Sequence, residues 1–314
     1  MNRSRLGAII AATALAAAAP SAAGARIVVV KSRALAAYDA AEQGFMSVVG
    51  SQAEGRTASY TLSGDAAAAG RLVSQIRSSP PDVVLALGTE AARQVGGALG
   101  SIPVVFAMVV DPVQSGVVSN LGHPGGNMTG VMLAVPPSES LQALKRAVPQ
   151  ARRVGVIYDP AQSQRAVREM TDAARGLGLQ VASRAVRSAA EVPRAAEELR
   201  GNIDALYAPV DGTVYSSQSA KFILLFALRS GIPVMGFSAN LVEAGALLAL
   251  YPDYVDVGRQ AGHMALRILS GEAAGNIAVA SPRKLLLAIN LSVERTLGVT
   301  IPQSLRKTAD KVFK

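Results

Sequence analysis

The stretch "VVFAMVVDP" (104–112) is an apolar run that stops at one carboxylate, Asp111, followed by a proline. Two further runs end in the same manner: "RRVGVIYDP" (152–160) stops at Asp159, and "IDALYAPVDG" (203–212) stops at Asp211. Continuously apolar runs of this kind are typical of parallel strands that are covered on both faces. The three aspartates therefore fall at the carboxyl ends of expected strands, where open α/β sheets bind their ligands.

Beyond these runs, short β-rich segments alternate with longer helical patterns, which predicts a parallel α/β architecture. "RIVVVKS" (26–32) and "DVVLALG" (82–88) are expected strands, the second one central, and Asp65 precedes a helical pattern as its N-cap. After the glycine-rich break "GHPGGNMTG" (122–130) the alternation starts again, so the halves follow one plan used twice. We therefore expect an α/β fold of two doubly wound, Rossmann-like lobes, with a hinge and an interlobe cleft.

Residues 1–25 have the layout of a secretory signal peptide. Arg3 and Arg5 precede an apolar stretch, and Ala23-Gly24-Ala25 forms a small-x-small site, so cleavage is expected after Ala25. The stretch is short for a membrane span, and the alternative is an uncleaved N-terminal anchor. Because the sequence has no cysteine, it predicts neither a disulfide framework nor a lipid anchor on an N-terminal cysteine. We expect the mature protein in the periplasm.

The formal net charge of +9 raises the question of a nucleic-acid or anionic partner. The basic residues are scattered through helical patterns, however, and a chain without tryptophan and with few other aromatic residues has little to stack on bases. We therefore attribute the charge to a solvated surface and expect no nucleic-acid partner.

The sequence contains no complete motif that is typical of a catalytic site. His123 and His263 lack metal-ligand spacing, and "SPRK" (281–284) matches S-x-x-K without its companion motifs. Neither a G-x-S-x-G elbow nor a G-x-x-x-x-G-K-[ST] phosphate-binding loop occurs. We therefore expect no enzyme, no metal and no cofactor, and an exported hydrolase is disfavoured.

Candidate ligand-binding residues are polar side chains at the expected strand ends and at the starts of the helices that follow: Thr89, Asp111, Asp159, Ser163, Asp211, Thr213 and Ser238. Helix N-termini offer N–H groups to a carboxylate, and an aspartate on the facing lobe suits an ammonium or hydroxyl group. A zwitterionic small molecule fits that pairing. The alternative for Asp111 and Asp159 is a capped turn before proline, and Asp211 is the better candidate for contact.

The chain resembles a known family in the stretch "IPVVFAMVVDPVQSGVVSNLGHPGGNMTGV", which begins at Ile102. That family is the ABC-transporter substrate-binding proteins of the tryptophan/tyrosine-uptake type, which have the type I periplasmic-binding-protein fold. Further matches are "PDVVLALGTEAARQ", "RRVGVIYDPAQSQ", "LYAPVDGTVYS", "PDYVDVGRQAG" and "NLSVERTLGVTIPQSLRKTADKV". The likeness thus covers almost the whole chain after the signal peptide.

The resemblance implies a monomeric receptor that closes over a small polar molecule, an amino acid or related compound, and presents it to a membrane permease. We expect one lobe from residues 26–128 and 244–278, and the other from residues 129–243 and 279–314. A sensor of the same fold that signals to a membrane kinase is the alternative.

Two departures from the family pattern concern charge. Asp159 stands where relatives commonly have asparagine, whereas Ser238 and Asn240 replace acidic residues of their loop. The carboxylate expected to bind an ammonium group is therefore moved or lost.

Overall fold

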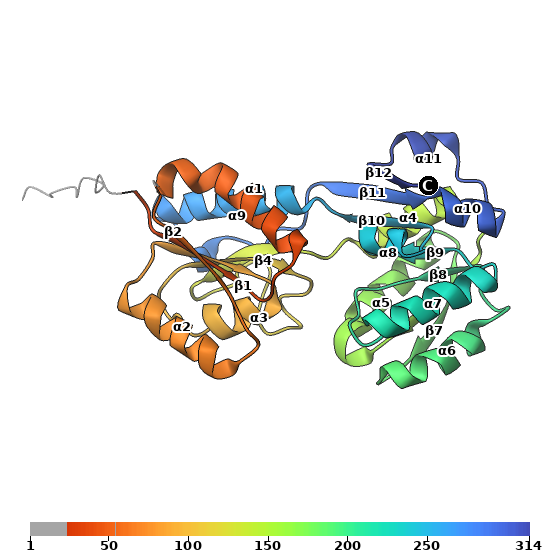
Figure 1. The fold of residues 1–314 in the computed structure, drawn as a ribbon, viewed down its shortest axis with the longest axis horizontal. Coiled ribbons are helices and arrows are strands. Elements are labelled where there is room, and N and C mark those ends of the chain that lie inside the picture. The colour runs from red at the N-terminus through yellow and green to blue at the C-terminus, as the bar shows by residue number, and fades with distance from the viewer. Residues whose placement is uncertain (1–23, 54) are drawn as a thin grey trace, which may run out of the picture.

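The computed structural model describes residues 24–53 and 55–314 (Figure 1). The expected signal peptide, apart from Gly24 and Ala25, lies outside the described residues. The described chain forms two β-sheets, each at the centre of one lobe, as the sequence predicts. Among the described helices, none combines the length and the apolar character that a bilayer span requires.

The first lobe, on the left in Figure 1, is built on a parallel sheet with the order β2-β1-β3-β4-β5. This is a doubly wound order, because β2 is added on one side of β1, and β3, β4 and β5 are then added on its other side. β3 is central and buried along its whole length, which confirms the prediction from its unbroken apolar run. The strands are β1 (Ile27–Lys31), β2 (Thr57–Thr61), β3 (Val83–Leu87), β4 (Val104–Val109) and β5 (Met128–Met132).

Helices cover both faces of this sheet. α1 (Ala36–Ala53) and α9 (Tyr254–Leu269) pack on one face, and α2 (Ala66–Ser78), α3 (Thr89–Ala91) and the π-helical turn η1 (Ala92–Gly96) pack on the other. Asp65 caps α2 as predicted, because its side chain accepts hydrogen bonds from the N–H groups of Ala67 and Ala68 at 2.9 and 3.2 Å. α1 and α9 touch backbone to backbone: a Cβ on Gly44 would lie 1.9 Å from the carbonyl oxygen of Val255.

The second sheet has the order β12-β11-β10-β9-β8-β6-β7. Its part from β7 to β10 repeats the strand order of the first sheet, which confirms the prediction of one plan used twice. β11 is antiparallel to β10, and β12 is parallel to β11. The strands are β6 (Arg153–Tyr158), β7 (Gln180–Ala185), β8 (Ala205–Tyr207), β9 (Val234–Gly236), β10 (Leu248–Pro252), β11 (Leu285–Asn290) and β12 (Lys311–Phe313).

Two buried clusters fill the space between this sheet and its helices. One lies under α4 and α5, with α10 and α11 at its edge, and the other lies under α6, α7 and α8. The helices are α4 (Pro137–Ala147), α5 (Pro160–Gly176), α6 (Val192–Leu199), α7 (Ser217–Arg229), α8 (Ala239–Glu243), α10 (Leu291–Leu297) and α11 (Gln303–Lys307), with short 3₁₀ turns η2 (Ala189–Glu191) and, in the first lobe, η3 (Ala274–Asn276).

The chain passes between the lobes after β5, after β10 and before β11 (Figure 1). The lobe limits expected from the sequence disagree at two places with the sheet to which a strand belongs. β5 pairs with β4 in the first sheet, although residues 129–132 are expected in the second lobe. β10 pairs with β9 and β11 in the second sheet, although residues 244–252 are expected in the first lobe. The glycine-rich break is therefore a loop that leads into an edge strand, and the lobe boundary comes after that strand.

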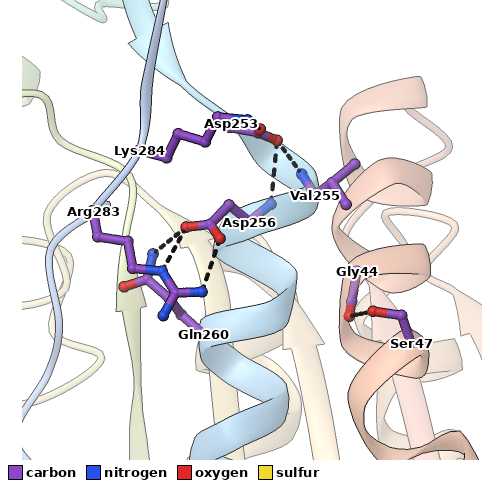
Figure 2. A network of polar contacts seen from close by, with 8 residues as sticks. All are labelled: Gly44, Ser47, Asp253, Val255, Asp256, Gln260, Arg283 and Lys284. Carbon is purple, nitrogen blue, oxygen red and sulfur yellow. Dashed lines mark hydrogen bonds and ion pairs between the residues drawn. The ribbon is translucent and has the colours of Figure 1, made fainter.

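Two ion pairs join the second and third crossings at the start of α9 (Figure 2). Lys284 Nζ lies 2.7 Å from the Asp253 carboxylate, which also caps α9 through the N–H groups of Val255 and Asp256. Burial raises the pKa of Asp253, but Lys284 and the backbone donors lower it more, so that it falls below its usual range. Arg283 holds Asp256 with two nitrogens, at 2.9 and 2.8 Å. The "SPRK" run thus lies at a crossing between the lobes.

Candidate functional site

A cavity of about 370 Å³ lies between the lobes, and both of them line it. This volume is within the range of roughly 300–1,000 Å³ that is usual for small-molecule sites. We call it the interlobe cavity. Its lining includes, from the first lobe, Leu35, Tyr38, Thr89, Met108 and Asp111; from the second, Gln162, Ser163, Arg165, Glu169, Tyr207, Phe237 and Ser238; and from the crossings, Leu133 and Tyr254.

The predicted site residues divide into two groups. Thr89, Asp111, Ser163 and Ser238 line the interlobe cavity, each close to the end of a strand or the start of a helix. The other residues, Asp159, Asp211 and Thr213, are all described but are not part of the lining. The two groups differ in what their polar atoms contact.

Asp111 uses its carboxylate oxygens for two purposes. Oδ1 accepts hydrogen bonds from the N–H groups of Val113 and Gln114 at 3.1 and 2.9 Å, which is the capped turn that Asp-Pro predicts. Oδ2 lies 3.1 Å from Nε of Arg165, which belongs to α5 in the other lobe. The Gln114 side chain makes a second link by donating to the carbonyl oxygen of Ala161 at 3.3 Å. Asp111 therefore caps its own turn and also contacts Arg165 at the cavity.

Arg165 lies between two carboxylates, because its Nε is also 3.2 Å from Oε1 of Glu169 one turn further along α5. We call Asp111, Arg165 and Glu169 the Arg165 triad. Its formal charge is negative, with two carboxylates around one guanidinium. The side chain of Arg165 is 39% exposed and that of Asp111 18% exposed, so the triad is open to solvent and to a ligand. A guanidinium pairs with a carboxylate, and a surplus carboxylate pairs with an ammonium group.

Asp211 is in a contrasting position. It is 2% exposed, and its carboxylate accepts four hydrogen bonds from the protein. Oδ1 accepts from the N–H groups of Thr213 and Val214, both at 3.0 Å. Oδ2 accepts from the N–H of Asp159 at 2.7 Å and from the hydroxyl of Ser163 at 2.6 Å. These donors occupy the carboxylate and fix the end of β6 against the turn after β8.

Asp159 completes this arrangement. Its side chain accepts from the Thr213 hydroxyl at 2.7 Å and from the N–H of Ala161 at 2.9 Å, as the N-cap of α5. The Thr213 hydroxyl, together with that backbone N–H, lowers the pKa of Asp159 although burial opposes the change. We call Asp159, Ser163, Asp211 and Thr213 the Asp211 network. It supports the cavity wall, where Ser163 is its lining member, and direct ligand contacts by the other three stay predictions.

Four aromatic side chains belong to the lining, beside aliphatic ones: Tyr38, Tyr207, Phe237 and Tyr254. Phe237 is held by an edge-to-face contact with Tyr215, with ring centroids 5.7 Å apart. Burial raises the pKa of Tyr207 to about 12, and the negative charge of Glu169 adds to the rise.

Sequence reasoning missed Arg165, Glu169 and the aromatic lining. A charged residue inside a helix looks like any solvated residue until the partner face of that helix is known. The signal that could have found it is spacing, since Gln162, Arg165 and Glu169 follow the Asp159 cap at successive steps of three, three and four residues. Within the described residues, no group of three or more His, Cys, Asp or Glu side chains is placed to hold a metal ion.

Comparison with known proteins identifies the family of the chain. A family model described as an ABC transporter substrate binding protein matches residues 42–313. The chain belongs to this family. The resemblance identified from the sequence motifs is thereby confirmed, and the family is one of substrate-binding proteins rather than enzymes.

Relatives and solved structures agree with this assignment. The substrate-binding protein described here is 30% identical over 230 residues to a tyrosine-binding protein of Clostridioides difficile (strain R20291). The aligned stretch covers 73% of this chain and 66% of that relative, just under two thirds of the relative's length.

Two solved structures cover nearly the whole chain. The ABC domain in complex with L-Trp from Streptococcus pneumonia has a TM-score of 0.75 and 25% identity, and covers 93% of this chain and 100% of that one. A ligand-free, open substrate binding protein with adhesive properties from Clostridium difficile has a TM-score of 0.76 and 26% identity, with 92% and 99% covered. The fold is thus that of the type I periplasmic binding proteins.

Proposed function

We propose that this substrate-binding protein binds an aromatic amino acid in the interlobe cavity and delivers it to the permease of an ABC importer. The observation that carries the proposal is the composition of one cavity, which combines the Arg165 triad with an aromatic lining. An amino acid needs both kinds of surface, because its backbone end is zwitterionic and its side chain is apolar.

The triad suits the zwitterion. Nε of Arg165 is taken up by Asp111 and Glu169, which leaves the terminal nitrogens of the guanidinium for the α-carboxylate of a ligand. The two carboxylates together exceed the charge of Arg165 and suit the α-ammonium group. In this proposal the acidic groups that Ser238 and Asn240 no longer supply come from the end of β4 and from α5 instead.

The lining suits an aromatic ring, because rings pack well on other rings and on apolar side chains. The named specificities of two similar proteins, tyrosine and L-Trp, support the same ligand class. A ligand that touches both lobes favours the closed arrangement and so shifts the population of lobe orientations. The family match favours a transporter over a sensor of the same fold.

Calorimetric titration of the purified protein tests the ligand class. We expect L-tryptophan, L-tyrosine and L-phenylalanine to bind, and tryptamine and indole-3-propionate to bind at least about tenfold more weakly. Tryptamine lacks the carboxylate, and indole-3-propionate lacks the ammonium group. Equal affinity for L-tryptophan and both analogues, or no binding of any aromatic amino acid, contradicts the proposal.

The role of Arg165 is tested with a matched pair of variants. Arg165→Gln should weaken L-tryptophan binding and reduce its advantage over tryptamine, because the partner of the carboxylate is gone. Arg168 lies on the same helix, is exposed and is outside the cavity lining. The Arg168→Gln variant should therefore bind L-tryptophan as tightly as wild type. Equal losses in the two variants would assign the effect to α5 as a whole.

Export is tested separately. We propose that residues 1–25 direct the chain out of the cytoplasm, on the basis of their basic start, apolar stretch and Ala-Gly-Ala site. Osmotic-shock fractionation should release the protein with the periplasm, and N-terminal sequencing should begin at Arg26. A chain found in the cytoplasmic fraction with Met1 intact contradicts this part of the proposal.

A further inference from the structure

Met108 has an unusual backbone at the edge of the interlobe cavity. Its φ of 62° lies in the left-handed region, and it is the one non-glycine residue of the described chain with a positive φ. An L side chain in this region crowds the backbone, so the conformation persists only where the surrounding structure requires it. Such residues cluster at active sites, ligand clamps and switch regions.

The pairing of β4 with β5 shows what the backbone does. Phe106 is the partner of Gly130, whereas Val109 is the partner of Met132. β4 therefore advances three residues while β5 advances two. One extra residue in β4 is a β-bulge, and bulges beside functional sites re-aim a side chain.

The packing partners show which side chain is re-aimed. Along a regular strand, successive side chains point to opposite faces. Phe106 and Val109 pack in the buried cluster under α2, whereas Ala107 and Met108 both pack in the cluster under α1 and α9. The alternation within β4 thus fails between Ala107 and Met108. The bulge keeps Met108 on the face of the sheet that Ala107 occupies.

On that face Met108 reaches the cavity. It is 5% exposed and belongs to the cavity lining. The first crossing fixes the bulge, because the N–H of Leu133 donates to the carbonyl oxygen of Val109 at 2.7 Å. A regular β4 would instead place residue 108 on the far face, under α2.

We infer that Met108 is a specificity-determining residue, whose thioether packs against the aromatic ring of the ligand. The inference rests on the proposed function. A methionine side chain is flexible and polarisable, and its sulfur makes favourable contacts with aromatic rings. The left-handed backbone at residue 108 is retained because it brings this side chain to the ring-binding part of the cavity.

The first experiment measures ring preference. Met108→Ala should lower the affinity for L-phenylalanine about tenfold and that for L-tryptophan less, because the larger indole fills more of the space that is created. The ratio of the two dissociation constants then moves toward L-tryptophan by about threefold. Met108→Leu, which keeps the volume, should stay near the wild-type ratio. Met264→Ala is the control, since Met264 is buried in the same cluster but lies outside the cavity lining.

The second experiment tests the backbone conformation at residue 108 through the stability of glycine and alanine variants. Replacing alanine by glycine in a strand normally lowers stability, because glycine loses more freedom on folding. At residue 108 the order should reverse, with Met108→Gly unfolding at a higher denaturant concentration than Met108→Ala, since glycine adopts a positive φ without crowding. Ala107→Gly is the control and should show the usual loss.

The outcomes separate the two proposals. If wild type binds aromatic amino acids but Met108→Ala keeps its affinity and ratio, the role of Met108 is overturned and the proposed function stands. If Met108→Ala and Met264→Ala weaken all ligands equally, Met108 is merely structural and the inference fails. If wild type binds no aromatic amino acid, both proposals fail. A Met108→Gly variant less stable than Met108→Ala overturns the account of the bulge.

Discussion

Asp111 and Asp211 come from the same sequence pattern, an apolar run followed by Asp and then Pro or Gly, yet they have different surroundings. Asp211 is buried and accepts four hydrogen bonds from protein donors. Asp111 keeps one oxygen for its own turn and directs the other at Arg165 across the cavity. A carboxylate whose acceptor sites are all taken by protein donors holds the surrounding structure in place, whereas one in a partly exposed ion pair is free to exchange its partner for a ligand.

The largest expected effect is on stability, from Asp211→Asn. An amide nitrogen would face donors in place of an acceptor, so we expect the free energy of unfolding to fall by about 3 kcal/mol. Urea denaturation measures it. Asp111→Asn is the matched substitution and should cost less than about 1 kcal/mol, because its ion pair is partly exposed to solvent. Equal losses would mean that the two carboxylates have the same role.

For ligand affinity we expect Asp111→Asn to have a larger effect than Asp211→Asn. Asp111→Asn removes a charge beside Arg165, and we expect the affinity for an aromatic amino acid to fall about tenfold. Titration calorimetry measures the change. The complementary variant Glu169→Gln removes the other carboxylate of the Arg165 triad. If neither variant weakens binding, the ammonium group is not bound by the triad.

A smaller effect, and one that depends on pH, is expected from Thr213→Val. Hydrogen bonds hold the pKa of folded Asp159 below the unfolded value of about 3.9, so they stabilise the protein above that pH. This stability is lost as the pH falls through about 4 toward the folded pKa. Thr213→Val removes the main cause and should cost about 1 kcal/mol at pH 7, with the gap to wild type closing in acid.

Unfolding curves between pH 7 and acid test this prediction. Thr171→Val is the control, because the Thr171 hydroxyl donates to the backbone oxygen of Val167 and to no carboxylate. Its cost should therefore be independent of pH. A Thr213→Val deficit that stays constant into acid contradicts the assignment of the Asp159 pKa to that hydroxyl.

The smallest effect should come from salt. Raising the ionic strength from about 0.05 M to about 0.5 M screens exposed charges and should weaken amino-acid binding about threefold. Buried groups are screened much less, so the difference in unfolding free energy between wild type and Asp211→Asn should stay the same. A salt-dependent difference would show that the Asp211 network is open to solvent.

The sequence predicted the fold well, because the signals for it are local. The unbroken apolar run of β3 indicated a central strand, and Asp65 indicated a helix start. The lobe limits were wrong around β5 and β10, since an edge strand next to a crossing looks the same from either lobe. Pairing decides its place, and pairing is not local.

The site was predicted in part for the same reason. Asp111, predicted because it ends an apolar run, lines the interlobe cavity, and its contact with a ligand stays a prediction. The role of Asp211 depends on the Ser163 hydroxyl, 48 residues earlier in the chain, and that of Arg165 on Asp111 in the other lobe. Met108 gave no signal, because a bulge depends on the pairing of β4 with β5. Residues whose roles depend on distant partners stay hidden in a single sequence.

The contact between α1 and α9 has a consequence for synthesis. Val255, against which Gly44 packs, follows it by 211 residues (255 minus 44). A growing chain therefore lacks α9 on one face of its first sheet, which α1 alone covers only in part, until most of the second lobe has left the ribosome. Contacts of such high sequence separation form late and slow the completion of folding. Late closure of the first lobe is compatible with the export proposed above, in which the chain would be threaded across a membrane before it folds.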